Sequence, residues 1–156
     1  MRIQRVLLVC SGNTCRSPMA AALLRELWRR AGAGWDLEVD SAGLGAFPGL
    51  PAAENAVAAM KARGIDLSGH RSKAVAGLEG YDLVLGMTRA HRDALRARFP
   101  EFAGRIFTLA EYAGTGSDLP DPFGGSLEVY ERTARDLEGG LQAVVERIRR
   151  EGSGAS

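Results

Sequence analysis

Four short apolar runs alternate along the chain with longer segments of helical periodicity. The runs are Val6–Val9, Trp35–Val39, Leu83–Leu85 and Ile106–Leu109. Short apolar strands separated by helices are typical of a parallel sheet that is covered by helices on both faces. We therefore predict an α/β fold with right-handed crossovers, in which ligands bind at the carboxyl ends of the strands.

The polar and apolar positions between these runs predict the helices. The expected segments are Pro18–Ala31, Ala52–Arg63, Arg89–Arg98 and a last helix with the apolar stripe Tyr130, Ala134, Leu137, Leu141, Val144 and Ile148. Thr88 is placed to cap the third helix, which must end before Pro100. The pair Gly139-Gly140 weakens the last helix by about 1 kcal/mol per glycine, which leaves its continuity open.

Composition narrows the class of protein. The 156 residues are enough for one domain with a buried core, and we expect a single domain over 1–151 followed by a disordered tail, 152–156. A net charge of +1 gives no general attraction to nucleic acid or membranes. The N-terminal residues lack the features of a signal peptide, and no stretch could span a bilayer, so we expect a cytoplasmic protein.

The segment from Cys10 to Ser17 carries the candidate chemistry. It lies where the first expected strand ends and the first helix begins, a junction at which backbone N–H groups and the helix dipole attract anions. The helix N-terminus, Arg16 and the Ser17 hydroxyl favour a thiolate at Cys10, which would be the nucleophile. Arg16 can hold two phosphate oxygens, and backbone amides can hold the others. The expected phosphate-binding residues are Ser11, Gly12, Asn13, Thr14, Cys15 and Arg16.

Other interpretations of this segment are weaker. Cys10 could simply pack at a strand end, as free cysteines often do. The ending GK[ST] of an ATP-binding loop is absent, and Gly43-x-Gly45 lacks the third glycine of a dinucleotide site. Both histidines are distant in sequence from Cys10 and Cys15, which does not suit a zinc site. We expect neither a metal nor a cofactor.

A general acid is expected in the turn-rich loop 118–125. A phosphate ester or phosphoramidate leaves poorly unless its leaving atom is protonated, and Asp121 is the better candidate for this role. Alternatively, Asp121 only caps the last helix with Pro122 at its first position. Asp118 is the second candidate for the acid. His91, in an arginine-rich helix, is expected to be solvated.

The motif Val9-Cys10-x-Gly12-Asn13-x-Cys15-Arg16-Ser17-Pro18-Met19-Ala20 resembles the signature of low-molecular-weight protein tyrosine phosphatases. The segments Asp40-Ser41-Ala42-Gly43, Gly64-Ile65-Asp66-Leu67, His70-Arg71-Ser72 and Asp121-Pro122 follow in the family's order. The resemblance implies a single-domain three-layer fold, with a four-stranded parallel sheet and the phosphate-binding loop after the first strand. It also implies metal-free hydrolysis of phosphorylated proteins through a cysteinyl-phosphate, with inorganic phosphate as product.

The same resemblance assigns supporting roles. It implies that Ser41 and His70 brace the loop through hydrogen bonds with Asn13; from the residues alone, His70 could equally be an exposed turn residue. It also suggests that Cys15 can form a disulfide with Cys10 on oxidation and so protect the nucleophile. Otherwise Cys15 is a second packed thiol.

Thr14 bears on the choice of substrate. The tyrosine-specific branch usually has a bulky aliphatic residue here, whereas the bacterial protein arginine phosphatases resemble this chain in Gly-Asn-Thr-Cys-Arg-Ser and in the segment Asp121 to Gly125. A polar Thr14 beside the Asp121 carboxylate suits a planar, cationic guanidinium. Gly124 and Gly125 would offer little stacking surface after Phe123. We therefore favour phosphoarginine over phosphotyrosine as substrate.

Two other functions compete with a phosphatase. An arsenate reductase shares the fold, but its chemistry needs further cysteines, and this chain has only two. A non-catalytic phosphate-binding module would not need both Cys10 and Asp121.

Overall fold

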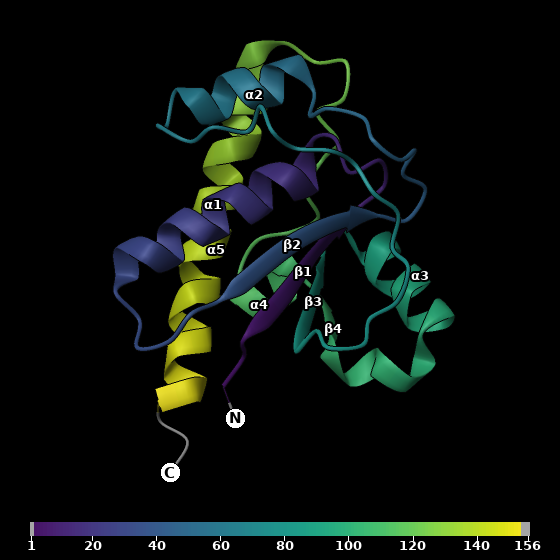
Figure 1. The fold of residues 1–156 in the computed structure, drawn as a ribbon, viewed down its shortest axis with the longest axis vertical. Helices are drawn as coiled ribbons and strands as arrows, with labels where there is room; N and C mark the ends of the chain where they lie inside the picture. The colour runs from purple at the N-terminus through teal and green to yellow at the C-terminus, as the bar shows by residue number, and fades with distance from the viewer. Residues whose placement is uncertain (1, 154–156) are drawn as a thin grey trace.

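Within residues 2–153, which the computed structural model describes apart from the Ser153 side chain, the centre is a four-stranded parallel sheet with the order β2-β1-β3-β4 (Figure 1). The strands are β1 (Arg5–Cys10), β2 (Glu38–Gly43), β3 (Leu83–Gly86) and β4 (Ile106–Thr108). The helices are α1 (Arg16–Ala31), α2 (Glu54–Lys61), α3 (Arg89–Arg98), the 3₁₀ helix η1 (Pro100–Arg105), α4 (Leu109–Ala113) and α5 (Leu127–Ser153). This confirms the predicted α/β architecture.

Strand β1 contributes to both hydrophobic cores. Val6 and Leu8 pack into the core that α1 and α5 share with the sheet, whereas Leu7 and Val9 pack into a second core on the α3 side. Burial on both faces explains why β1 is a continuous apolar run. Its last residue, Cys10, therefore lies at the carboxyl end of a central strand, where a ligand site is expected in such sheets.

The long helix α5 is continuous through its glycine pair. Each residue of the predicted stripe is at most 2% exposed. A Cβ atom on Gly140 would lie only 2.6 Å from Leu109 Cδ2, whereas one on Gly139 would meet no atom within 4 Å. Gly140 thus allows α4 to pack closely against α5, and burial of the stripe outweighs the low helix propensity of the pair.

Several boundaries differ from the sequence prediction. Strand β2 is Glu38–Gly43 and not Trp35–Val39, because it pairs in register with β1 from Arg5 to Cys10 and carries polar residues toward the site. Trp35 instead packs edge-on against Trp28, with 5.1 Å between ring centroids.

Some helix ends also differ, and α2 is two residues shorter at each end than the predicted Ala52–Arg63. Helix α1 starts two residues earlier than predicted, since Pro18 fits the first turn, where no intrahelical N–H bond is needed. Helix α5 continues through Gly152 to Ser153, so this part of the predicted disordered tail is helical. Residues 154–156 lie outside the described residues. The short helices η1 and α4 were not predicted, because each is too short to show a periodic apolar pattern.

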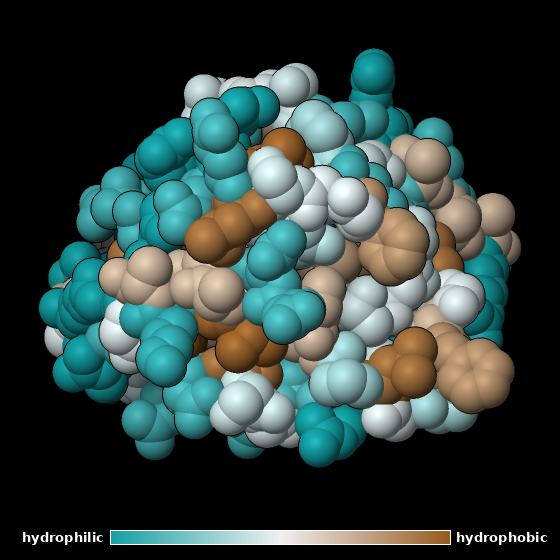
Figure 2. All heavy atoms as spheres, turned by 90° about the horizontal axis from the view of Figure 1, so that it is seen from above, coloured by the Kyte–Doolittle hydropathy of each residue, from teal (hydrophilic) through white to brown (hydrophobic). Residues whose placement is uncertain are grey.

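Polar and apolar side chains are mixed on the surface. Figure 2 shows one face on which brown and tan apolar groups lie among teal polar ones. The large apolar side chains that are exposed within residues 2–153 are Phe47, Leu50, Phe123 and Leu127. No helix in the same range is long and apolar enough to cross a membrane.

Alanine substitutions at the glycine pair are expected to have different effects. Gly139→Ala should raise the free energy of unfolding by roughly 0.5–1 kcal/mol, because alanine is the better helix former and the site is open. Gly140→Ala should raise it less or lower it, because the added methyl group meets Leu109. Urea unfolding of both variants measures the difference, and an equal gain would contradict the packing argument.

Candidate active site

The loop from Cys10 to Cys15 lies close against the end of β2. A Cβ atom on Gly43 would lie 3.0 Å from the Asn13 backbone nitrogen and 2.5 Å from the Ser11 carbonyl oxygen, so only glycine allows this approach. Asn13 itself has φ 58°, the left-handed conformation that asparagine tolerates better than most residues. The loop therefore curls tightly between β1 and α1.

Asn13 is fully buried and connects the loop to its surroundings. Its amide nitrogen donates to Ser17 Oγ at 2.8 Å and to Ser41 Oγ at 2.9 Å. Its side-chain oxygen accepts from the Lys73 backbone N–H at 3.0 Å. Because the side chain is consumed by these bonds, Asn13 can bind an anion only through its backbone N–H.

Ser17 links this network to Cys10. Ser17 Oγ lies 2.9 Å from Cys10 Sγ, and both side chains are buried. Since Ser17 Oγ already accepts a hydrogen bond from Asn13, its own proton is available to the sulfur. The carbonyl of Ala42, at 3.5 Å, is the more distant acceptor. The Ser17 hydroxyl is therefore placed to donate a hydrogen bond to the Cys10 sulfur.

Arg16 is buried, and one nitrogen of its guanidinium group has no hydrogen-bond partner. Its Nη1 donates to the Leu119 carbonyl at 2.9 Å, and its Nη2 lies 3.7 Å from Asp121 Oδ2. Nε is buried and has no hydrogen-bond partner. Nε and Nη2 share the edge of the guanidinium that can hold two oxygens of one anion. An unpaired buried donor is unfavourable in the free protein, which makes this edge a candidate anion site.

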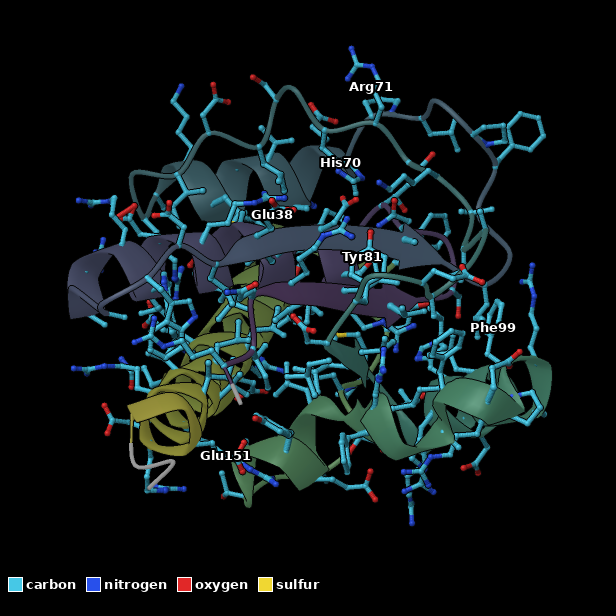
Figure 3. The ribbon with its side chains drawn as sticks, turned by 60° about the horizontal axis from the view of Figure 1, so that its bottom comes forward. Glu38, His70, Arg71, Tyr81, Phe99 and Glu151 are labelled. Carbon is cyan, nitrogen blue, oxygen red and sulfur yellow. The ribbon has the colours of Figure 1, made fainter. Side chains whose placement is uncertain are left out.

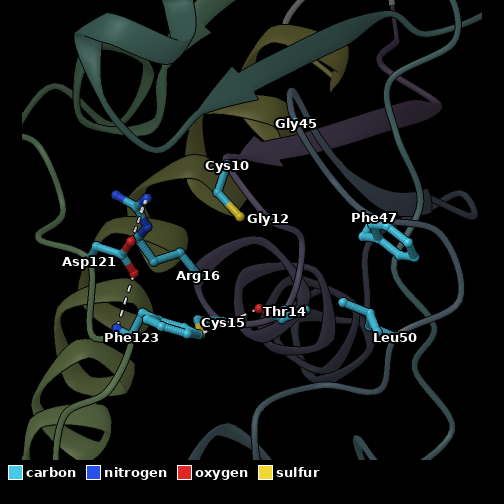
Figure 4. Close-up of a pocket in the computed structure, with 10 residues that line it drawn as sticks. All are labelled: Cys10, Gly12, Thr14, Cys15, Arg16, Gly45, Phe47, Leu50, Asp121 and Phe123. Carbon is cyan, nitrogen blue, oxygen red and sulfur yellow. Dashed lines mark hydrogen bonds and ion pairs between the residues drawn. The ribbon is translucent and has the colours of Figure 1, made fainter.

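Cys10 and Arg16 lie in a pocket of about 290 Å³ (Figure 4). The residues that line it are Cys10, Gly12, Thr14, Cys15, Arg16, Gly45, Phe47, Leu50, Asp121 and Phe123. Phe47 and Leu50 lie on the opposite side of the loop from Asp121 and Phe123.

The apolar rim differs from the prediction. Phe47 and Phe123 are 72% and 76% exposed, so they form two apolar walls at the mouth of the pocket. Sequence reasoning missed Phe47 and Leu50, although an aromatic residue between glycines and prolines in a loop was a usable signal. The predicted lining by Gly124 and Gly125 is wrong: the described pocket is lined by Phe123 instead.

Asp121 lies at the pocket and Asp118 does not line it. Asp121 Oδ1 accepts from the Phe123 N–H at 3.1 Å, which closes a turn, and its other oxygen faces Arg16. The alternative in which Asp121 caps α5 is wrong, because α5 begins only at Leu127 and Ser126 Oγ accepts from the Val129 N–H. Asp118 accepts from the Arg89 N–H at the start of α3 and so holds the loop in place.

Two further side chains approach the loop: Ser41 from β2 and His70 from the segment after α2. The His70 ring points inward while the neighbouring Arg71 points outward (Figure 3). His70 Nε2 lies 2.7 Å from the Asn13 carbonyl oxygen and therefore donates to it. Burial lowers the pKa of His70 below its usual value, and the bond to Asn13 opposes this. The structure thus brings Ser41, His70 and Asn13 together.

His91 is not solvated, and sequence reasoning missed it. The residue is 6% exposed, and its ring nitrogens lie 2.9 Å from Thr88 Oγ1 and 2.9 Å from Ser11 Oγ. The Ser11 side chain is thus directed at His91, which leaves its backbone N–H for an anion. Thr88 caps α3 as predicted. The sequence did hold a signal for the position of His91. It lies three residues after the capping Thr88, close to the carboxyl end of β3, where ligand sites are expected.

Cys15 differs chemically from Cys10. Both are free thiols, and Cys15 Sγ lies 3.2 Å from the buried Tyr130 hydroxyl and 3.7 Å from Thr14 Oγ1. Burial raises the pKa of Cys15, which keeps it a neutral thiol near pH 7. Within residues 2–153, no three His, Cys, Asp or Glu side chains are grouped so that they could hold a metal ion.

Comparison with known proteins places this pocket in a family. The sequence profile of the low molecular weight phosphotyrosine protein phosphatases matches residues 5–154. The chain belongs to this family. It is therefore a cysteine-dependent protein phosphatase.

Several named relatives match the phosphatase over nearly its whole length. A protein-arginine-phosphatase of Geobacillus stearothermophilus is 41% identical, over 94% of this chain and 97% of the relative. A probable low molecular weight protein-tyrosine-phosphatase, EpsP of Ralstonia solanacearum, is 39% identical over the same shares. A solved structure of the YwlE arginine phosphatase, a variant with a phosphorylated active-site serine, superposes with a TM-score of 0.90 at 36% identity, over 95% of this chain and 97% of that one.

The stability of the phosphatase should fall as the pH is lowered below about 6.5. Burial lowers the pKa of both His70 and His91 in the folded protein from 6.5, the ordinary value. The unfolded chain therefore binds protons first on acidification, and folding loses free energy from pH 6.5 down to the folded pKa values. Urea unfolding at pH 7.5, 6.5 and 5.5 measures this loss. His70→Asn and His91→Asn should each flatten the dependence, and an unchanged slope in both would contradict the argument.

Proposed function

We propose that the phosphatase hydrolyses phosphoarginine in proteins through a phosphorylated Cys10. The observation that carries this proposal is the Nε–Nη2 edge of buried Arg16, whose Nε has no hydrogen-bond partner and which lies in one pocket with Cys10 and Asp121. A phosphoryl group fits between these three residues, with two oxygens on Arg16 and the rest on loop amides. Preorganised donors of this kind supply most of what phosphoryl transfer needs.

The reaction has two steps. In the first, the Cys10 thiolate attacks phosphorus and forms the S–P bond, while the bond to the leaving nitrogen breaks and the Asp121 carboxyl group gives that nitrogen its proton. In the second, the Asp121 carboxylate takes a proton from water, whose oxygen attacks phosphorus and releases the thiolate and inorganic phosphate. Ser17 is placed to stabilise the sulfur anion at the start and at the end.

Thr14 supports phosphoarginine as substrate. Thr14 lines the pocket with a hydroxyl group that can accept a hydrogen bond from a guanidinium. The Asp121 carboxyl group also lines the pocket, and its carbonyl oxygen can accept from a guanidinium N–H while its proton is kept for the leaving nitrogen. The relatives named arginine phosphatases match this chain over nearly its full length, which supports the same preference.

Phosphotyrosine is the second candidate, and the rim of the pocket favours it. Phe47 and Phe123 are exposed on either side of the entrance, where an aromatic ring could pack between them. The same walls can also stack on a planar guanidinium, so they accommodate either substrate.

Cys15 and the cellular setting complete the proposal. Peroxide would oxidise Cys10 to a sulfenic acid, and the Cys15 thiol would then displace water to form a Cys10–Cys15 disulfide. Two free thiols suit a reducing compartment, which supports a cytoplasmic location and phosphorylated proteins as partners.

Asp121→Asn should separate leaving-group protonation from nucleophilic attack. We expect a burst of p-nitrophenol from p-nitrophenyl phosphate, whose leaving group needs no proton, followed by slow turnover as Cys10–phosphate accumulates. With phosphoarginine peptides the rate of phosphoenzyme formation should fall by about 10²–10⁴-fold. Cys10→Ser should release no phosphate from either substrate.

Asp118→Asn is the matched control for this test, because Asp118 belongs to the same loop but does not line the pocket. A larger loss in Asp118→Asn than in Asp121→Asn would reassign the acid. A wild-type protein without activity on any phosphorylated peptide would overturn the proposed function.

Thr14→Ile should shift the substrate preference toward phosphotyrosine. The larger aliphatic side chain removes an acceptor for the guanidinium and adds an apolar wall for a phenol ring. We expect the ratio of kcat/KM for phosphotyrosine over phosphoarginine peptides to rise by on the order of tenfold. Thr14→Val, which removes the hydroxyl at nearly constant size, should give part of the shift. An unchanged ratio in both variants would refute the role of Thr14.

A further inference from the structure

His91 joins helix α3 to the residue beside the nucleophile. Its Nδ1 lies 2.9 Å from Thr88 Oγ1 at the start of α3, and its Nε2 lies 2.9 Å from Ser11 Oγ. Ser11 follows Cys10 directly in the chain. One buried ring therefore holds the first residue of the loop from the side of the sheet that faces α3.

The backbone fixes the position of this ring. Strand β3 ends at Gly86, where a Cβ atom would lie 3.0 Å from His91 Cβ and 3.1 Å from the Arg92 nitrogen. A larger residue at this position would push the first turn of α3 away from the sheet. The next N–H, that of Met87, donates to the Val9 carbonyl at 3.0 Å, which ties this turn to β1 just before Cys10.

The other contacts to the loop come from the opposite side. Asn13 is held by Ser41 of β2, by His70 and by the Lys73 backbone. These bonds act on the second half of the loop. The Ser11 carbonyl accepts from the Gly45 N–H at 3.0 Å, but the Ser11 side chain is directed at His91. The β2 side thus holds Asn13 and the Ser11 backbone, whereas the Ser11 side chain is held from the α3 side.

We propose that His91 is a positioning residue of the phosphatase, which acts through Ser11 to fix the peptide that follows Cys10 for binding the phosphoryl group. His91 does not line the pocket and so acts on the substrate only indirectly. The proposal rests on the assignment of the loop as the phosphate site made above. The loop would thus be positioned by the Ser11–His91 hydrogen bond on the α3 side as well as by the hydrogen bonds around Asn13.

The charges around His91 favour a neutral ring. Burial and the positive charge of Arg16 lower its pKa, while Asp118 and Asp121 of the acid loop oppose this. A neutral ring has one N–H donor and one acceptor nitrogen, so the bonds to Thr88 and Ser11 have opposite directions. The ring therefore fixes the orientation of the Ser11 hydroxyl as well as its place.

Two amide substitutions separate the bonds of His91. The amide of His91→Asn reaches about the position of Nδ1 and can keep the bond to Thr88, whereas that of His91→Gln reaches about the position of Nε2 and can keep the bond to Ser11. We expect His91→Asn and Ser11→Ala each to lower kcat/KM for p-nitrophenyl phosphate by about tenfold, the effect of one hydrogen bond. The double variant should lose little more, because the same contact is removed. His91→Gln should retain most of the activity.

Binding of inorganic phosphate, measured by calorimetry, provides a readout that does not depend on turnover. Its dissociation constant should rise about as much as kcat/KM falls in His91→Asn, and stay near the wild-type value in His91→Gln. Asp93→Asn is the control on α3, because the Asp93 side chain is exposed and contacts Arg92. It should match the wild type in both measurements.

Three outcomes would overturn the positioning role. The first is a phosphate affinity in His91→Asn equal to that of the wild type. The second is an additive loss of kcat/KM in the double variant. The third is an equal loss in His91→Asn and His91→Gln, which would indicate that His91 has only a structural role. If a variant unfolds, the ring ¹⁵N resonances of His91 in the wild type test the proposal, since they must shift when phosphate binds. A wild type that binds phosphate with the expected pattern but hydrolyses nothing would refute the proposed function and leave this inference standing.

Discussion

The buried side chain of Asn13 is the contact on which the geometry of the site depends. A fully enclosed amide must have its donors and acceptor satisfied, and Asn13 meets this requirement with Ser17, Ser41 and the Lys73 backbone. These partners belong to α1, to β2 and to the segment that follows α2. Because one amide joins all three, the left-handed conformation of the loop is held by the whole central part of the molecule.

The base of the pocket is buried, whereas its entrance is exposed to solvent. Cys10, Arg16 and Ser17 are buried at the end of β1 and the start of α1, between two hydrophobic cores. Such a frame keeps hydrogen-bond donors in place before an anion arrives, so little reorganisation is needed. The phenylalanines at the entrance, by contrast, extend from loops into solvent, where side chains can adapt to the group that carries the phosphoryl.

The sequence was most informative where one physical requirement dominated. The apolar runs predicted β1 and β3, and the spacing of Tyr130 to Ile148 predicted the buried face of α5, because burial leaves a periodic pattern. Strand β2 was misplaced, since Asp40 and Ser41 interrupt its apolar pattern: Ser41 binds Asn13, and Asp40 pairs with Lys73. His91 was missed for a similar reason: a polar residue among arginines resembles a solvated face, and only the close approach allowed by Gly86 reveals its burial. Phe47 lies in a loop without periodicity, so its position at the pocket depended on tertiary structure.

The bond from Arg16 to the Leu119 carbonyl has a consequence for how this protein can diverge. The same guanidinium lines the pocket, holds the loop between Gly114 and Leu127, and lies beside Asp121 of that loop. Amino-acid changes that shift the loop therefore also displace the Arg16 side chain in the pocket, even where the changed residue does not line it. Amino-acid drift along this loop is therefore coupled to Arg16 by epistasis, because a change in the backbone near Leu119 alters the position of the guanidinium.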